Sequence, residues 1–363
     1  MAEREFIVTY RLIAASADDA ARVSREIALE QTVELPEGAF SAAIEANVVP
    51  CRRRLEPVGD GFELDLAFDE ALIAGEPTQL LNLLFGNISL KRGIRIQRVE
   101  PSSIFAKMFP GPAYGVSGWR DLCQVRRRRP LLCTALKPVG LKAQELADLC
   151  RKMAEGDADL VKDDHGLTDQ SSAPFRERVR RCQNAVSGFR TRYVPNITAS
   201  PAETLRRLEF AVDHGCRAVM VSPLLCGIDT LIDVARTGRV AILAHPALSG
   251  AYFSADHGIA PEVLLGDIVR RCGADGVIYP EAGGRFPLTE EDCSRLRDSL
   301  REEKQDVKPS MPVPGGGLRI NGVQDRIDAN GPDTIYLVGG SLHDDNDVAR
   351  STRGVMEALR ASA

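Results

Sequence analysis

Residues 131–138 read LLCTALKP, an uninterrupted apolar run that ends abruptly in a lysine and a proline. A run without polar residues at every second position is typical of a strand buried on both faces, as in a parallel sheet. Seven similar runs follow, at 160–162, 193–197, 218–222, 241–244, 276–279, 311–313 and 334–338. Helix-like segments such as 143–154 and 202–214 separate them. Strands that alternate with helices in this way predict repeated βαβ units.

Eight such units lie within residues 116–363, which is close to the usual size of a (β/α)8 barrel, about 250 residues. A doubly wound sheet is the alternative. It rarely needs eight parallel strands, and no G-x-G-x-x-G turn of the kind that binds dinucleotides in that fold is present. We therefore expect an α/β fold with a (β/α)8 TIM barrel at residues 116–363.

The first 115 residues show a different pattern, that of a small α+β domain. Strand-like stretches occur at 6–12, 40–49, 62–68 and 94–99, and helix-like spacing of apolar residues occurs at 17–29 and 71–84. Ser16 stands directly before the first helical stretch, where its hydroxyl can cap free backbone N–H groups. Two prolines and a glycine at Phe109–Pro112 mark the change of pattern, and we expect domains at 1–115 and 116–363.

Composition narrows the class of protein. The 363 residues include 51 acidic and 46 basic ones, and the net charge of −5 is small for this length. We therefore expect no nucleic-acid partner and no electrostatic membrane anchor. The chain has no apolar run of about 18 residues, and its start, MAEREFIVTY, lacks the apolar core of a signal peptide. Nine cysteines without metal-binding spacing predict reduced thiols in a cytoplasmic enzyme.

Polar residues gather where the apolar runs end, and in a barrel the carboxyl ends of the strands surround the active site. The second run leads into Lys162-Asp163-Asp164-His165. Lys162 and Asp164 share one face of the strand, and His165 follows as the loop begins. This group could hold a divalent cation, provided that the lysine is neutral or converted to a carbamate. The alternative is an ion pair between Lys162 and one of the two aspartates.

Other runs end in polar residues as well. Lys137 ends the first run, Asn196 and Thr198 end the third, and His245 ends the fifth. A histidine at this position could exchange protons with a substrate or bind one of its hydroxyl groups. The alternative is a core histidine that is satisfied by the backbone.

Glycine clusters follow the last two runs, at 315–317 and 339–340. Phosphate sites in (β/α)8 barrels commonly use the loops after strands seven and eight, where small residues let backbone N–H groups approach the anion. Two glycine clusters at these two strands favour a phosphorylated substrate over two ordinary turns.

Three segments resemble a known family. They are FPGPAYG at 109–115, CTALKPVGL at 133–141 and DLVKDDH at 159–165. They are similar to the large subunit of ribulose-bisphosphate carboxylase (RuBisCO) and to its non-carboxylating relatives, the RuBisCO-like proteins. The resemblance covers nearly the whole chain. It implies a ferredoxin-like N-terminal domain before the barrel, and a homodimer in which the N-terminal domain of one subunit helps to close the barrel of the other.

The resemblance also implies a metal site. Lys162 matches the lysine that the family carbamylates, and Asp164 matches a ligand of Mg²⁺. His165 stands where the family has a glutamate ligand. Because imidazole suits Mn²⁺ or Co²⁺ better than Mg²⁺, we expect a site that binds Mg²⁺ more weakly and also takes Mn²⁺ or Co²⁺. Alternatively, His165 has left the metal and serves as the acid or base.

Further site residues follow from the same resemblance. Lys137 matches the family's catalytic lysine on the first strand, and His245 matches its histidine on the fifth. Asn87, in FGNIS, resembles the asparagine that the partner subunit contributes, and Glu30 matches the glutamate of the N-terminal domain. The glycines on the family's phosphate-binding loops are Gly316, Gly317, Gly339 and Gly340.

Two departures from the family predict that the protein is not a carboxylase. The loop 281–286, EAGGRF, lacks the mobile lysine of carboxylases, and Pro246 replaces the arginine that binds a second phosphate. One phosphate site fits a ketose monophosphate. We expect metal-assisted enolisation, with isomerisation of 5-methylthioribulose 1-phosphate in sulfur salvage as the leading function. A decarboxylase of a 3-oxo sugar-acid phosphate, similar to 3-oxo-isoapionate 4-phosphate, is the alternative, and a non-enzymatic binding role is the third.

Overall fold

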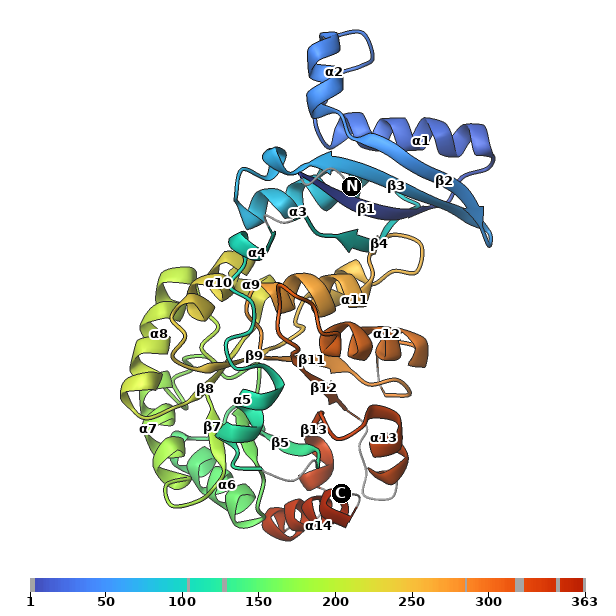
Figure 1. Cartoon of the computed structure of the whole chain (residues 1–363). Helices are drawn as coiled ribbons and strands as arrows, with labels where there is room; N and C mark the ends of the chain where they lie inside the picture. Colours follow the sequence, from blue (N-terminus) through green and yellow to red (C-terminus); the bar gives the residue numbers. More distant parts are fainter. Residues whose placement is uncertain are drawn as a thin grey trace. The chain divides into compact units, whose positions relative to one another are not determined.

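The structure is a computed structural model that describes residues 4–102, 105–125, 129–284, 286–316, 323–343 and 347–361. The chain divides into two compact units (Figure 1). The first comprises residues 1–109 together with 248–264, and the second comprises 110–247 and 265–363. The first unit thus ends where the Pro-Gly-Pro stretch begins, and it also takes a segment from the middle of the barrel sequence.

The second unit contains an eight-stranded parallel sheet among its described residues, which confirms the expected (β/α)8 barrel. The strands are β5 (Leu131–Leu136), β6 (Leu160–Asp163), β7 (Arg192–Val194), β8 (Ala218–Val221), β9 (Ala241–Ala244), β11 (Gly276–Pro280), β12 (Met311–Gly315) and β13 (Ile335–Val338). Their order is β7-β6-β5-β13-β12-β11-β9-β8. Backbone bonds join the two outer strands, because Met220 N–H donates to Pro195 O at 2.8 Å and Ile197 N–H donates to Met220 O at 3.0 Å. Each of the eight predicted apolar runs coincides with one strand.

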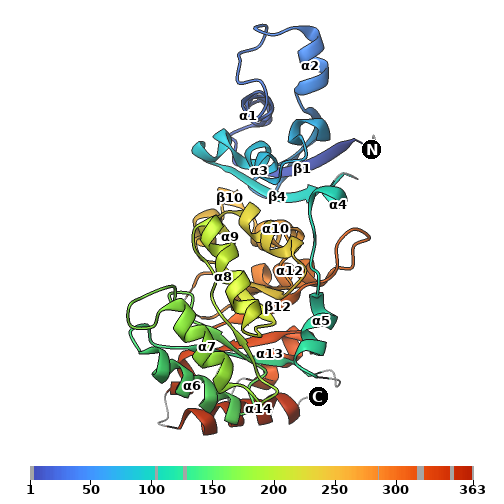
Figure 2. The ribbon, with the colours of Figure 1, turned by 90° about the vertical axis from the view of Figure 1, so that its left-hand side faces the viewer.

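Helices cover the outside of the barrel, and Figure 2 views the side formed by α6, α7 and α8. The helices are α5 (Gly115–Leu122), α6 (Ala143–Glu155), α7 (Phe175–Ala185), α8 (Pro201–Asp213), α9 (Pro223–Cys226), α10 (Ile228–Arg236), α12 (Glu290–Arg301), α13 (Val323–Asn330) and α14 (Val348–Ala361). A π-helical turn, η4 (Leu264–Val269), precedes β11, and a 3-10 turn, η6 (Gly340–His343), follows β13. In α6 the buried residues Leu146, Cys150 and Met153 recur at helical spacing, so one face packs against the strands.

The barrel interior is filled with apolar side chains. Cys133, Leu160, Met220, Leu243 and Val313 are all fully buried there. Trp119, the only tryptophan of the chain, lies on α5 and belongs to the same cluster. The barrel is therefore a packed core, and the polar residues at the strand ends are the part of the strands left for chemistry.

The first unit is a ferredoxin-like α+β domain, as expected. Its main elements are β1 (Glu5–Leu12), α1 (Ala17–Glu30), β2 (Cys51–Val58), β3 (Gly61–Asp69), α3 (Pro77–Phe85) and β4 (Ile94–Glu100). Its shorter ones are α2 (Ala42–Val48), η1 (Glu70–Ile73), η2 (Asn87–Leu90), α4 (Phe105–Met108), η3 (Ser249–Tyr252) and α11 (Pro261–Val263). The strands lie in the order β4-β1-β3-β2, each antiparallel to its neighbours. The segment that returns from the barrel adds β10 (Gly258–Ile259), parallel to β4.

Two predictions for this unit were wrong. The strand expected at 40–49 is instead the helix α2, which starts because Ser41 Oγ accepts the N–H of Ile44 at 3.3 Å. None of its residues is buried, so the apolar alternation there did not reflect a core. The helix expected at 71–84 is interrupted, because Ala74 and Gly75 have φ of 53° and 74° and end η1 before α3 begins.

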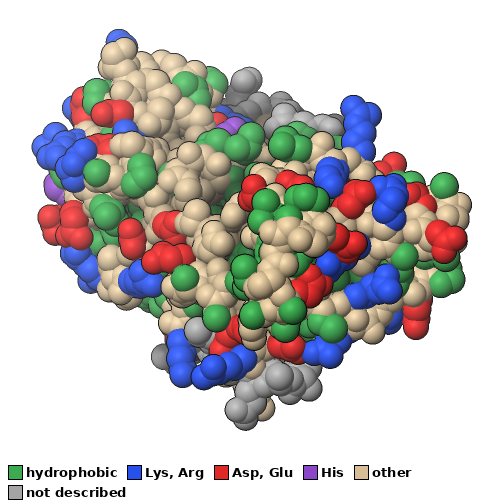
Figure 3. All heavy atoms as spheres, turned by 90° about the horizontal axis from the view of Figure 1, so that it is seen from above, with side chains coloured by type: hydrophobic (Ala, Val, Ile, Leu, Met, Phe, Trp, Pro, Cys, Tyr) green, Lys and Arg blue, Asp and Glu red, His purple; other side chains and the backbone are tan. Residues whose placement is uncertain are grey.

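Charged side chains are mixed on the surface. On the face drawn in Figure 3, basic and acidic groups lie interspersed, in line with the net charge of −5. Within the described ranges, no helix is both long enough and apolar enough to cross a membrane.

Candidate active site

Four of the predicted site residues meet at the carboxyl ends of β5, β6 and β9. Lys137 follows β5, Asp164 and His165 follow β6, and His245 follows β9. Lys137 Nζ lies 3.0 Å from Asp164 Oδ1, and His165 Nδ1 lies 3.6 Å from Asp164 Oδ2. The rings of His165 and His245 stack, with centroids 4.5 Å apart and planes 14° from parallel. Residues of three strands thus form one cluster.

Lys162 is buried in β6, with 2% of its surface exposed. Its Nζ donates to the backbone carbonyl oxygen of Asp163 at 3.0 Å. Burial lowers the pKa of this amine because an ammonium is poorly solvated there, and nearby anionic groups only partly oppose the effect. A lowered pKa favours the neutral amine, which is the form that can react with CO2 to give a carbamate.

The carboxylate of Asp164 is ionised at neutral pH. Burial by itself would raise its pKa, but hydrogen bonds from His165 and Lys137 outweigh burial and hold the pKa below its usual range. The backbone N–H of Gly166 adds a third bond to Oδ2, at 3.2 Å. This loop residue therefore presents a negative charge to the cluster.

His245 is uncharged. Burial, with smaller contributions from neighbouring groups of positive charge, lowers its pKa to about 2. Its Nδ1 accepts the N–H of Ala247 at 3.2 Å, so the proton of the neutral ring lies on Nε2. The side chain is a neutral hydrogen-bond donor.

The donor set fits a divalent cation only if Lys162 contributes to it. Among the residues that the structure describes, no three His, Cys, Asp or Glu side chains lie close enough together to hold a metal ion. Asp164 and His165 offer one oxygen-donor and one nitrogen-donor side chain. A carbamate on the neighbouring Lys162 would supply the missing oxygen ligands, and burial already favours the neutral amine from which a carbamate forms.

The predicted phosphate-binding glycines differ in how well they can be placed. A Cβ on Gly339 would lie 3.9 Å from Lys137 Cε, so the end of β13 lies beside the cluster. Gly316 has φ of +97°, which favours glycine, and a Cβ there or on Gly340 would meet none of the residues that the structure describes within 4 Å. Gly317 lies outside the described residues.

Glu30 and Asn87 lie together in the first unit. Asn87 Nδ2 donates to Glu30 Oε1 at 3.1 Å, and Gln31 Oε1 accepts the backbone N–H that follows Asn87, also at 3.1 Å. His257, for which the sequence predicted no role, contacts the same segment, because its Nε2 lies 2.9 Å from Ser89 O. Asn87, which the resemblance assigns to a partner's site, is thus hydrogen-bonded to Glu30, which it matches to the glutamate of the N-terminal domain.

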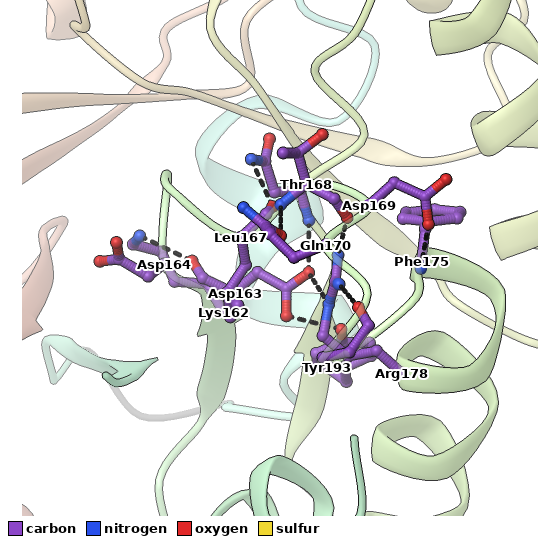
Figure 4. A network of polar contacts seen from close by, with 12 residues as sticks. Lys162, Asp163, Asp164, Leu167, Thr168, Asp169, Gln170, Phe175, Arg178 and Tyr193 are labelled. Atoms are coloured by element: carbon purple, nitrogen blue, oxygen red, sulfur yellow. Dashed lines mark hydrogen bonds and ion pairs between the residues drawn. The ribbon is translucent and has the colours of Figure 1, made fainter. Parts of the chain in front are cut away.

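A second polar network supports the loop after β6 (Figure 4). Asp163 Oδ2 lies 3.1 Å from Arg178 Nε, and Asp163 Oδ1 accepts the hydroxyl of Tyr193 at 2.7 Å. Asp163 and Asn196 stand out in the sequence as polar residues at strand ends, whereas Arg178 and Tyr193 do not. Arg178 stands in the charged stretch RERVRRC, and its one distinguishing signal is that it falls in the helical register of the buried residues at 175, 179 and 182.

Residues 116–362 match the family described as ribulose bisphosphate carboxylase large chain, catalytic domain. The chain belongs to the RuBisCO large-chain family, as its motifs predicted. It is 38% identical over 351 residues to ribulose bisphosphate carboxylase-like protein 1 of Rhodopseudomonas palustris, which covers 94% of this chain and 93% of that one. It is 36% identical over 348 residues to the 5-methylthioribulose-1-phosphate isomerase of Rhodospirillum rubrum, at coverages of 93% and 91%. Among solved structures, a RuBisCO-like protein from Rhodopseudomonas palustris matches with a TM-score of 0.89 and 30% identity, over 98% of each chain.

Proposed function

We propose that the protein is a non-carboxylating, RuBisCO-like enzyme that enolises and isomerises 5-methylthioribulose 1-phosphate in methionine salvage. The observation that carries this proposal is the cluster of Lys137, Asp164, His165 and His245 at the ends of three barrel strands. It places groups that carry protons beside groups that can hold a cation, as enolisation requires. The similarity to the isomerase of Rhodospirillum rubrum supports this substrate.

Three side chains would hold the cation, namely Lys162 as a carbamate, Asp164 and His165. Held there, Mg²⁺ would supply a positive charge beside the carbonyl of the ketose, which would favour removal of a proton from the neighbouring carbon. Because one ligand is an imidazole, Mn²⁺ or Co²⁺ is acceptable in place of Mg²⁺.

The side chains around this position divide the proton transfers between them. A carbamate oxygen on Lys162 takes the proton from the carbon beside the carbonyl. Lys137 Nζ, held by Asp164 Oδ1, returns a proton to the neighbouring carbon. Neutral His245 donates from Nε2 to a substrate hydroxyl and adds no charge. One proton leaves and one arrives, so the isomerisation needs no oxidant or co-substrate.

The phosphate and the second subunit complete the proposed site. The glycines after β12 and β13 would bind the single phosphate through backbone N–H groups. The Glu30–Asn87 pair would come from the partner of a homodimer. We place the enzyme in the cytoplasm, because all nine cysteines are free thiols and eight of them are buried.

Conversion of 5-methylthioribulose 1-phosphate tests this proposal. Purified protein is incubated with the substrate, Mg²⁺ and bicarbonate in D2O, and the products are followed by ¹H and ³¹P NMR. We expect a new sugar monophosphate with deuterium beside its carbonyl and no released CO2, and we expect no product from Lys162→Ala. Failure of the folded wild-type protein to convert the substrate with Mg²⁺, Mn²⁺ or Co²⁺ would overturn the proposal. Release of CO2 from a 3-oxo sugar-acid phosphate would favour the decarboxylase instead.

A further inference from the structure

The loop from 164 to 174, between β6 and α7, carries two of the three proposed cation ligands. Its backbone is held by a buried arginine, Arg178, whose side chain has no exposed surface. Arg178 Nη1 donates to Ala173 O at 2.7 Å, and Nη2 donates to Thr168 O at 2.8 Å. Its third donor, Nε, reaches Asp163 Oδ2 at 3.1 Å (Figure 4). One guanidinium thus links two points of the loop to the residue directly before Asp164.

Asp163 is held equally firmly from the other side. Its Oδ1 accepts the hydroxyl of Tyr193 at 2.7 Å, and its Oδ2 accepts the backbone N–H of Asn196 at 3.0 Å. Burial would lower the pKa of Arg178, but the interactions with Asp163 and Tyr193 together outweigh burial and keep the pKa above its usual value. Both side chains are fully buried in the barrel wall and are held from several directions.

Asn196, at the end of β7, extends the network to the ligand residues themselves. Its Nδ2 donates to His165 O at 3.0 Å and to Leu167 O at 2.9 Å. Its Oδ1 accepts the N–H of Thr198 at 3.1 Å, which fixes the orientation of the amide. Asn196 thus fixes the carbonyl group of His165 from the neighbouring strand. Because the side chain leaves the same backbone, this bond also sets the direction of the imidazole.

We propose that Arg178 and Asn196 are positioning residues, which set the geometry of Asp164 and His165 through the backbone of this loop. The inference rests on the proposed cation site and extends it. A buried ion pair adds little net stability, because desolvation offsets the attraction between its charges. Charge neutralisation of Asp163 would also require only one of the donors of Arg178. The other two bind the ligand-bearing loop, so the arrangement favours a role in orientation.

The test compares two arginines that are buried alike. Arg178→Lys keeps the charge beside Asp163 but loses the fork that reaches Thr168 and Ala173. Arg270→Lys is the matched control, because Arg270 is also fully buried and donates to backbone carbonyls elsewhere in the barrel unit, including Lys308 O at 2.9 Å and Ser299 O at 2.7 Å. Mn²⁺ binding is measured by electron paramagnetic resonance in bicarbonate buffer, without substrate, and thermal unfolding is recorded for each protein.

We expect Arg178→Lys to weaken Mn²⁺ binding by about 10- to 100-fold, as is usual for residues that orient ligands. Arg270→Lys should lower the unfolding temperature about as much as Arg178→Lys does. Unlike Arg178→Lys, it should leave the Mn²⁺ affinity at the wild-type value. If Arg178→Lys does not fold, Asn196→Asp decides the question, because it keeps the acceptor for Thr198 and removes both donors to the loop. It should weaken Mn²⁺ binding about tenfold or more.

Two outcomes would overturn the inference in different ways. Equal Mn²⁺ affinity in wild type, Arg178→Lys and Asn196→Asp would reject positioning and leave the proposed function standing. A wild-type protein that binds no Mn²⁺ would reject the cation site, and with it both proposals.

Discussion

The carboxylate of Asp275 is buried at the start of β11, where it holds α5 against the barrel. Its Oδ1 accepts the N–H groups of Tyr114 and Gly115 at 2.6 and 2.8 Å, and its Oδ2 accepts that of Ile242 at 2.8 Å. These three bonds favour the ionised carboxylate, whereas burial disfavours it. Burial has the larger effect, and it raises the pKa of Asp275 to about 6.

We predict that the stability of the wild-type protein falls between about pH 4 and 7, and that Asp275→Asn removes this fall. The unfolded chain releases this proton at a pKa of about 3.9, so between about pH 4 and 6 the folded protein binds a proton that the unfolded chain has lost. Wild-type stability therefore falls as pH rises through this window. A shift of about two pKa units corresponds to about 3 kcal/mol. Asparagine does not titrate, so the variant should not lose this amount as pH rises. Its Nδ2 cannot accept an N–H group, so one of the three bonds is lost at every pH, at a cost of about 1–3 kcal/mol.

Urea denaturation between about pH 4 and 7 measures the difference. The signal is the fluorescence of Trp119, which is unique in the chain and buried in the helix that Asp275 holds. Asp159→Asn is the control, because Asp159 is also buried but paired with Arg129 at 2.7 Å. Removing its charge leaves that arginine unpaired and should destabilise the protein by about 3–5 kcal/mol across the range. An Asp275→Asn protein whose stability falls between about pH 4 and 7 by as much as that of wild type would contradict this prediction, because Asp275 would then not be the group that titrates.

Three further predictions concern the proposed site. Lys162→Ala should abolish turnover while circular dichroism stays at the wild-type signal, and an active variant would remove Lys162 from the site. Mixing inactive Asn87→Ala with inactive Lys162→Ala should restore roughly a quarter of the wild-type activity, because random exchange of subunits gives mixed dimers with one intact site. If exchange is demonstrated and no activity returns, each site is built by a single chain. His165→Glu should shift activation from Mn²⁺ towards Mg²⁺, and full turnover with an unchanged metal preference would leave His165 without a role there.

The barrel and the cluster at its strand ends could be predicted because both rest on local patterns. A stretch such as LLCTALKP has apolar residues on both faces of the strand and ends in a charge, so it indicates both burial and the end of the strand. Parallel strands place their carboxyl ends on one side, which is why Lys137 and Asp164, on neighbouring strands, were expected at one site. Their ion pair at 3.0 Å follows from that geometry.

The supporting network could not be predicted in the same way. Arg178 is one of four arginines in α7, and helical spacing shows which of them faces the barrel but not which acid it meets. The sequence also does not show whether that acid is Asp163 or Asp164, because the two residues are adjacent. The structure separates their roles, because successive residues at the end of β6 point to opposite sides. Asp163 pairs with Arg178 in the barrel wall, while Asp164 pairs with Lys137 at the strand ends.

The return of residues 248–264 to the first unit was invisible in the sequence for a different reason. Its strand β10 has two residues, too few to show a period, and the contact of His257 with Ser89 spans 168 positions. Closing a longer loop adds little to its entropic cost, since that cost grows only with the logarithm of length. A few local contacts therefore suffice to fix such a return. The one local sign of the return is Gly258. Its φ is +123°, and a Cβ there would lie 2.0 Å from Tyr252 O, so the position requires a glycine. A lone glycine after a histidine is too common in sequences to indicate that the chain returns to the first unit. The contact that supports the Asn87 segment is therefore seen only in the fold.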